Sequence, residues 1–194
     1  GDHRDLHGTS HSFPTRRSSD LTGTFGSFIG FSASLPLLAK KEFPEVDVLK
    51  YVWIAPLVGA ISRAATGWVA DKWGGARVTF WVFVAMILGV LGVVHFLEAN
   101  NFQGFLAMFI FMFFVTGIGN ASTFKQMPMI FERRQAGGVI GWTAAIAAFG
   151  PFLFGVGLNF LGAVTFYWIG VAWAVGCVAL TWMRYARKGA PKPS

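Results

Sequence analysis

One arginine stands inside a long apolar segment of this chain. Arg63 lies near the middle of the stretch 49–70, whose one other charge is Lys50 at its edge. A cation at the centre of a membrane helix costs about 2.5–3.5 kcal/mol on insertion scales, so it normally faces a protein interior or a wet cavity and meets an anion there. The first hypothesis is therefore an anion pathway through a membrane.

The composition places that arginine in an integral membrane protein. Hydrophobic residues make up 54% of the chain and charged residues only 13%, and the mean hydropathy is +0.55. These values fit neither a soluble domain nor a disordered one. The net charge of +7 comes from lysines and arginines in connectors and tails, without a basic stripe, so no nucleic-acid partner is expected. The single cysteine, Cys177, excludes a disulfide framework.

Apolar runs predict the elements that position Arg63. About twenty apolar residues cross a bilayer as a helix, and lipid leaves the backbone no partner outside the helix. The runs are continuous rather than alternating, which excludes a membrane β-barrel pattern. We therefore predict an all-α, polytopic bundle over residues 22–185, with six membrane helices at 22–39, 49–70, 78–97, 102–131, 139–161 and 164–183.

The two ends of the chain differ from this bundle. Residues 1–21 are polar, lack the apolar core of a signal peptide, and contain a string, SHSFPTRRSSDL, that resembles a translated sequencing adapter. We expect a non-native segment, or alternatively a disordered tail, and hence a chain truncated on its N-terminal side. Residues 186–194 are expected to form a basic cytoplasmic tail, because lysines and arginines concentrate on that side of the predicted topology.

The connector after the second run carries a motif. Gly67, Asp71, Lys72, Gly74, Gly75 and Arg77 supply a small residue, an acid followed by a base, a glycine turn and a final base. Glycine lets helices approach closely and permits a tight reversal of the chain. The pattern resembles the short cytoplasmic-loop motif of the major facilitator superfamily, whose members have two six-helix halves with the site between them. An ordinary charged turn is the alternative interpretation.

Three further strings extend the resemblance. They are FGSFIGFS from Phe25, GAISR ending at Arg63, and GIGNASTF from Gly117. In order and spacing they are similar to the C-terminal half of the nitrate/nitrite porters, over nearly all of residues 22–185. The fifth run resembles that family's second nitrate signature through Gly141 and Gly150. Ala147 and Pro151 depart from it, which leaves open a distinct subgroup, altered helix bending or a changed gate.

The resemblance implies a role for each matching residue. Arg63 would be one arm of a two-arginine clamp, Phe25 the aromatic that covers the planar anion, and Gly141 and Gly150 sites of close helix approach and backbone contact with the ion. Each has a structural alternative: carbonyl pairing for Arg63, a lipid-facing position for Phe25 and packing for the glycines. Three polar residues of the fourth run, Asn120, Ser122 and Thr123, are candidates for lining the cavity or for hydrogen bonds between helices.

We expect nitrate and nitrite transport by alternating access in a bacterial inner membrane, with the C-terminus in the cytoplasm. The partners would be the two anions, the lipid bilayer and a missing N-terminal six-helix half. No catalytic motif, cofactor site or metal site is expected. The alternatives are a porter for another small anion and a non-transporting, anion-binding membrane protein. Absence of a carboxylate inside the runs favours nitrate/nitrite exchange over proton symport.

Overall fold

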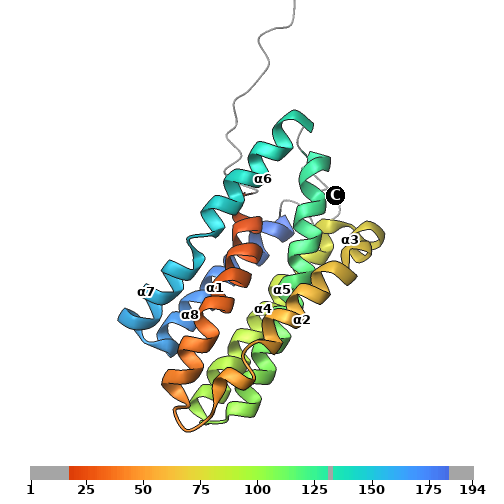
Figure 1. Cartoon of the computed structure of the whole chain (residues 1–194). Helices are drawn as coiled ribbons and strands as arrows, with labels where there is room; N and C mark the ends of the chain where they lie inside the picture. Colours follow the sequence, from red (N-terminus) through yellow and green to blue (C-terminus); the bar gives the residue numbers. More distant parts are fainter. Residues whose placement is uncertain (1–17, 131–132, 184–194) are drawn as a thin grey trace, which may run out of the picture.

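The computed structural model describes residues 18–130 and 133–183, and this part of the chain is helical throughout, without strands (Figure 1). The expected tails 1–21 and 186–194 lie outside the described residues, apart from 18–21, which belong to the first helix. In chain order the elements are α1 (Ser18–Glu42), η1 (Val48–Lys50), α2 (Ile54–Ala65), α3 (Gly67–Trp73), α4 (Gly75–Glu98), α5 (Phe102–Ile130), α6 (Arg133–Ala147), α7 (Gly150–Leu161) and α8 (Ala163–Thr181).

Five helical segments of the described chain are long and apolar enough to cross a membrane. They are Val48–Ala65, Arg77–Glu98, Phe102–Phe124, Ile140–Leu161 and Ala163–Thr181. They correspond to five of the six predicted runs. The first predicted run lies within α1, which is helical but is not among these five, so its crossing stays a prediction. The all-α, polytopic class is confirmed.

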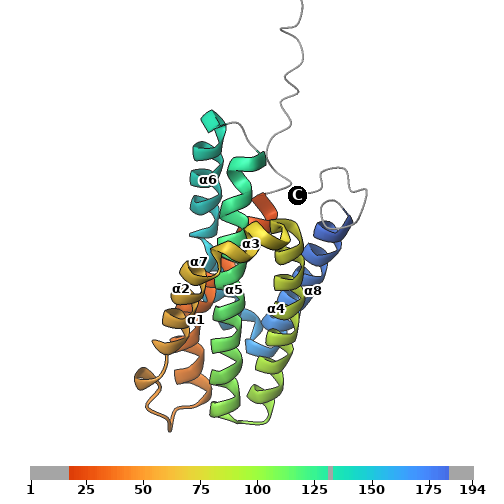
Figure 2. The same cartoon turned by 90° about the vertical axis from the view of Figure 1, so that its right-hand side faces the viewer.

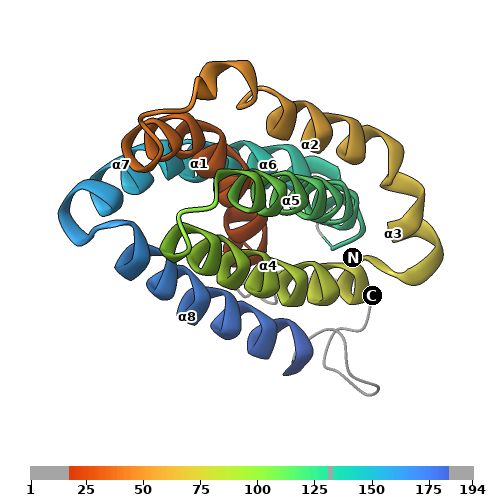
Figure 3. The same cartoon turned by 90° about the horizontal axis from the view of Figure 1, so that it is seen from below.

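Helix α5 is at the centre of the bundle. Viewed along its length, α1, α2 and α4 surround α5, while α7 and α8 lie farther out (Figure 3). The core is aromatic: the Phe105 and Phe109 rings are 4.8 Å apart, and Phe31 of α1 meets Phe109 edge-on at 6.0 Å. Edge-to-face aromatic pairs add to the energy of area burial. These ring contacts hold α1 against α5. The polar residues of α5 from Asn120 onward follow the aromatic cluster along that helix.

Two predicted runs are broken in the structure. The second run divides into α2 and α3 at Thr66, whose hydroxyl donates to the Ser62 carbonyl oxygen at 2.6 Å. The fifth divides into α6, ending at Ala147, and α7, beginning at Gly150 with Pro151 in its first turn. Proline has no N–H and its ring clashes with the carbonyl four residues earlier, here that of Ala147. The sequence left three explanations open for Ala147 and Pro151, and the break between α6 and α7 agrees with one of them, altered helix bending.

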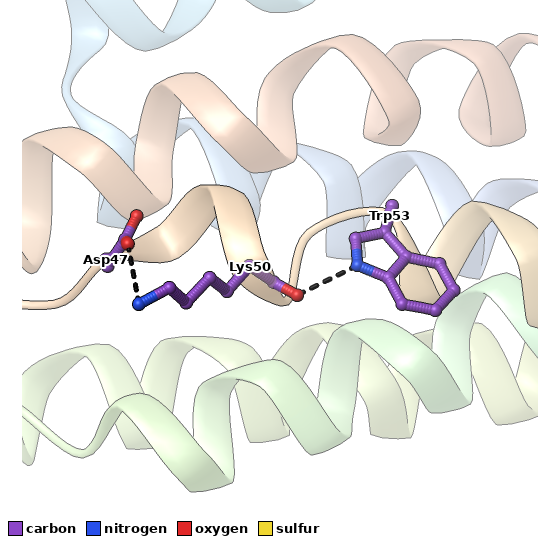
Figure 4. Close-up of polar contacts among 3 residues, drawn as sticks. All are labelled: Asp47, Lys50 and Trp53. Atoms are coloured by element: carbon purple, nitrogen blue, oxygen red, sulfur yellow. Dashed lines mark hydrogen bonds and ion pairs between the residues drawn. The ribbon is translucent and has the colours of Figure 1, made fainter.

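The end of the bundle opposite α3 is closed by η1 and the connection between α4 and α5 (Figure 2). At η1 the Lys50 ammonium lies 3.1 Å from the Asp47 carboxylate, and the Trp53 indole N–H donates to the Lys50 carbonyl oxygen at 2.8 Å (Figure 4). Both charged groups are exposed, so water and salt screen their attraction. This contact orders the entry into α2 without contributing much stability.

Candidate functional site

Arg63 is positioned by a close crossing of α2 and α5. Ser62 Oγ donates to the Phe114 carbonyl oxygen on α5 at 3.1 Å and lies 2.9 Å from the Gly59 carbonyl oxygen of its own helix. A Cβ on Gly117 would overlap Ser62 Oγ and stand 2.5 Å from the Gly59 carbonyl oxygen and 3.2 Å from Arg63 N. Because glycine at this position lets the two backbones touch, the Arg63 backbone has a fixed place on α5.

The Arg63 side chain runs along α5 from that crossing. It is exposed on the surface of the bundle, and its guanidinium carbon lies 4.9 Å from the centroid of the Phe124 ring. Phe124 is two turns beyond Gly117, so the side chain extends toward the α3 end of the bundle. Arg63 also occupies the last turn of α2, where the helix dipole favours a cation. The predicted position at the centre of an unbroken helix is therefore wrong: the charge stands at the end of a helix, on the bundle surface.

The side of α2 that carries Arg63 faces α1 as well as α5. Gly59, one turn earlier on the same helix face, would meet Phe28 of α1 and the Phe113 carbonyl oxygen of α5 if it carried a Cβ. Helices α1 and α2 are joined through η1 and run antiparallel. Moving one turn from Gly59 to Arg63 on α2 therefore corresponds to moving one turn toward the N-terminus from Phe28 on α1. Position 25 of α1 thus lies level with the Arg63 backbone. The Phe25 side chain is outside the described part of the chain, and its role stays a prediction.

The two signature glycines have different surroundings. A Cβ on Gly150 would stand 2.7 Å from the Gly26 carbonyl oxygen of α1, whereas one on Gly141 would meet nothing within 4 Å. Gly26 follows position 25, so Gly150 lies at the same level of the bundle as Phe25 and the Arg63 backbone. Gly141 is about two and a half helical turns away. A similar level of the bundle thus holds three of the four predicted substrate-binding positions, namely Phe25, Gly150 and the Arg63 backbone. Gly141 is exposed and lies apart.

The motif after α2 is mostly helical. Gly67 begins α3, and Asp71 and Lys72 lie on that helix, both exposed. The second predicted helix ended at residue 70, but α3 continues to Trp73. Asp71 and Lys72, which were expected in the connector, are therefore helical. The predicted glycine reversal is present: Gly74 has φ +82°, which disfavours side chains, and α4 begins at Gly75 with Arg77 in its first turns. The gating role of the six motif residues stays a prediction.

The three polar residues of α5 are buried among helices. Ser122 Oγ and Thr79 Oγ1 of α4 form a hydrogen bond at 3.1 Å, and Thr123 Oγ1 donates to the Gly119 carbonyl oxygen at 2.8 Å. The first bond joins α4 to α5 and agrees with the alternative of hydrogen bonds between helices, whereas the second lies within α5. Within the described chain the carboxamide of Asn120 is fully buried and has no hydrogen-bond partner. A role of these residues in lining a cavity stays a prediction.

The chemistry that the Arg63 guanidinium offers is recognition of an anion. A guanidinium is charged at every physiological pH and donates from a planar fork that matches an oxyanion. Over the described residues no group of three or more His, Cys, Asp or Glu side chains could hold a metal ion.

Comparison with known proteins places the fold and the site in a family. Residues 20–155 match the model of the Major Facilitator Superfamily. The chain belongs to the major facilitator superfamily. It is 45% identical over 183 residues to a probable nitrate/nitrite antiporter of Thermus thermophilus, covering 88% of this chain and 41% of that protein. It is 35% identical over 196 residues to a nitrate/nitrite transporter of Escherichia coli, covering 85% of this chain and 42% of that protein.

A nitrite extrusion protein of Bacillus subtilis is 29% identical over 133 residues, covering 66% of this chain and 32% of that protein. These relatives confirm the resemblance to nitrate/nitrite porters, and with the apolar helices they identify this superfamily member as a membrane protein. The chain spans about two fifths of the length of the first two relatives.

Two contributors to the site, Ser62 and Phe124, stand in the strings that carry the resemblance, but the sequence assigned no role to either. Phe124 is one of 21 phenylalanines, and its contact with Arg63 joins residues far apart in the chain. Ser62 precedes an arginine of obvious interest, but a serine within an apolar run has several uses. The spacing of Gly59 and Ser62 on α2, together with Gly117 on α5, was the available hint of a close helix crossing.

Proposed function

We propose that the chain is the C-terminal six-helix half of a transporter that exchanges nitrate and nitrite across a bacterial inner membrane. The observation that carries the proposal is the placement of Arg63. Its backbone is locked at the crossing of α2 and α5, its side chain is exposed on the bundle surface, and the face of α2 that it occupies turns toward α1. An arginine that belonged only to the interior would be covered.

Nitrate suits such a group chemically. It is a planar oxyanion, and two of its oxygens can accept parallel, charge-assisted hydrogen bonds from one guanidinium. Lysine offers a point charge without the fork. The aromatic at position 25 would cover the flat face of the anion, and Gly150, at the same level, would allow the backbone to approach. The relatives named as nitrate/nitrite transporters support this choice of anion.

Transport would follow an alternating-access cycle with a second six-helix half. The outer faces of α2 and α7 are rich in exposed apolar side chains, including Ile61, Phe152 and Phe160. Such surfaces need lipid or protein against them. In the cycle, the anion would neutralise the repulsion between Arg63 and an arginine of the other half, and the two halves could then close around it. Release on the opposite side would restore the repulsion and reopen the cavity.

The proposed orientation places α3 and the C-terminus in the cytoplasm. The connector with Lys72 and Arg77 and the basic end of the chain would then lie on the side that positive residues favour. Lys40, Lys41 and Lys50 would lie on the opposite side. Accessibility of single cysteines placed at Lys50 and at Lys72, in a background in which Cys177 is replaced, tests the orientation in intact cells.

Transport is tested with vesicles that contain this chain together with the part of the Thermus relative that the chain does not match. Nitrite-loaded vesicles should take up labelled nitrate, and Arg63→Lys should raise the KM for nitrate about tenfold or more, since losing one charge-assisted bond costs about 1.5–3 kcal/mol. Vesicles with the chain alone should show no flux. Robust flux from the chain alone would refute the half-transporter proposal, and a normal KM in Arg63→Lys would refute bidentate recognition.

A further inference from the structure

We propose that Phe124 is a positioning residue that holds the Arg63 guanidinium where an anion can dock. The inference rests on the proposed function and adds a residue to its site. The guanidinium carbon lies 4.9 Å from the centroid of the Phe124 ring, inside the range of about 6 Å in which the negative face of an aromatic ring attracts a cation. Phe124 is partly buried on α5, so the ring itself has a firm support.

The position of Phe124 on α5 makes it suited to this task. Gly117, two turns earlier on the same helix face, would contact Arg63 N and overlap Ser62 Oγ if it carried a Cβ. One helix therefore holds both ends of the arginine, the backbone at Gly117 and the guanidinium at Phe124. The two turns between them span about 10 Å. The arginine side chain covers part of this distance, and the Phe124 side chain, which leans toward the N-terminus of its helix, covers the rest. Any shift of α2 against α5 would separate the cation from its ring.

Holding the guanidinium before the anion arrives would favour binding. An arginine side chain carries about 2 kcal/mol of rotamer entropy, and a group that is already ordered loses less on binding. The Phe124 ring contains no oxygen or nitrogen acceptor, so its contact with Arg63 uses none of the charge-assisted hydrogen bonds with which a guanidinium binds an oxyanion. Phe124 would therefore act on affinity through Arg63 without touching the substrate.

The first test measures nitrate transport by the two-part transporter described above. Phe124→Leu should raise the KM for nitrate about three- to tenfold with little change in kcat, in line with cation–π contributions. Phe124→Tyr should have the KM of the parent, because tyrosine keeps an aromatic ring at this position. Replacement of Phe124 by mono-, di- and trifluorinated phenylalanine should raise the KM in steps, because fluorine weakens the negative ring face and leaves the shape nearly unchanged. Phe114, exposed on the same helix, serves as the control in the same leucine and fluorine series, with no change expected.

The outcomes separate the inference from the proposed function. If Arg63→Lys weakens nitrate transport while the fluorinated series at Phe124 leaves the KM unchanged, the inference is overturned and the proposed function stands. If Arg63→Lys has no effect on nitrate transport, the assignment of Arg63 to the anion site is wrong. The fluorinated variants also decide the matter if Phe124→Leu does not fold, because they preserve packing.

A second measurement needs no transport. In the 194-residue chain in detergent, the Arg63 Hδ protons should have ring-current shifts that disappear in Phe124→Leu and persist in Phe114→Leu. Arg63 shifts that are identical in the parent chain and in Phe124→Leu would overturn the contact itself, whatever the substrate.

Discussion

Substitution of Gly117 by alanine tests whether the α2–α5 crossing sets the position of Arg63. The new Cβ would overlap Ser62 Oγ and stand 2.5 Å from the Gly59 carbonyl oxygen, where ordinary contact begins at 3.4 Å. The serine can rotate, but the carbonyl belongs to the α2 backbone and must retreat by about 0.9 Å. Overpacking of this kind typically costs about 1–3 kcal/mol, which exceeds the gain of about 0.8–1.0 kcal/mol from replacing glycine by alanine within a helix.

The net loss for Gly117→Ala is therefore as much as about 2 kcal/mol, or a fall in melting temperature of up to roughly 4–8 °C for a chain of this size. A thiol-reactive dye reports the unfolding of the detergent-solubilised chain, because its one cysteine, Cys177, is buried in α8. Gly155→Ala is the matched control: its Cβ would meet nothing within 4 Å, so it should melt at or above the parent temperature. Equal melting of Gly117→Ala and Gly155→Ala would refute a tight crossing.

Two further predictions concern other contacts of the bundle. Gly150→Ala should lower the melting temperature relative to Gly155→Ala on the same helix, because its Cβ would stand 2.7 Å from the Gly26 carbonyl oxygen; a Gly150→Ala chain as stable as the control would mean that α1 and α7 do not touch there. The buried Thr79–Ser122 hydrogen bond should give a coupling of about 0.6 kcal/mol, at most about 1.7, in a cycle of Thr79→Val, Ser122→Ala and the double variant. Strictly additive single effects in that cycle would show that the bond contributes nothing.

The helices could be predicted from the sequence because lipid imposes a simple rule on chain length and polarity. Runs of apolar residues located α4, α5 and α8 to within a few residues. The same rule is blind to interruptions, since a threonine hydroxyl that bonds to the preceding turn and a proline without an N–H change average hydropathy very little. Breaks near Thr66 and Pro151 therefore divide two predicted helices, and helix α3 extends three residues beyond the predicted end at residue 70.

The candidate site was predictable in part. Arg63 is conspicuous because a cation among apolar residues is expensive, and Gly150 was found through a resemblance. The contact between Phe124 and the guanidinium was not predictable. Phe124 ends the string GIGNASTF, but the contact depends on how α2 and α5 cross. Gly141 had the same local signature as Gly150, yet only Gly150 lies beside α1. Tertiary packing, which sequence periodicity does not encode, separates the two.

The central claim is that the Arg63 guanidinium binds the transported anion. Its most direct measurement is the nitrate dissociation constant of the purified two-part transporter, compared between the parent, Arg63→Lys and Lys50→Ala. Lys50→Ala removes a cation at the opposite end of the bundle and shows whether net charge, which Arg63→Lys leaves unchanged, affects nitrate binding. The account predicts binding about tenfold or more weaker in Arg63→Lys and unchanged in Lys50→Ala. Equal nitrate affinity in the parent and Arg63→Lys, or an equal loss in both variants, would contradict it.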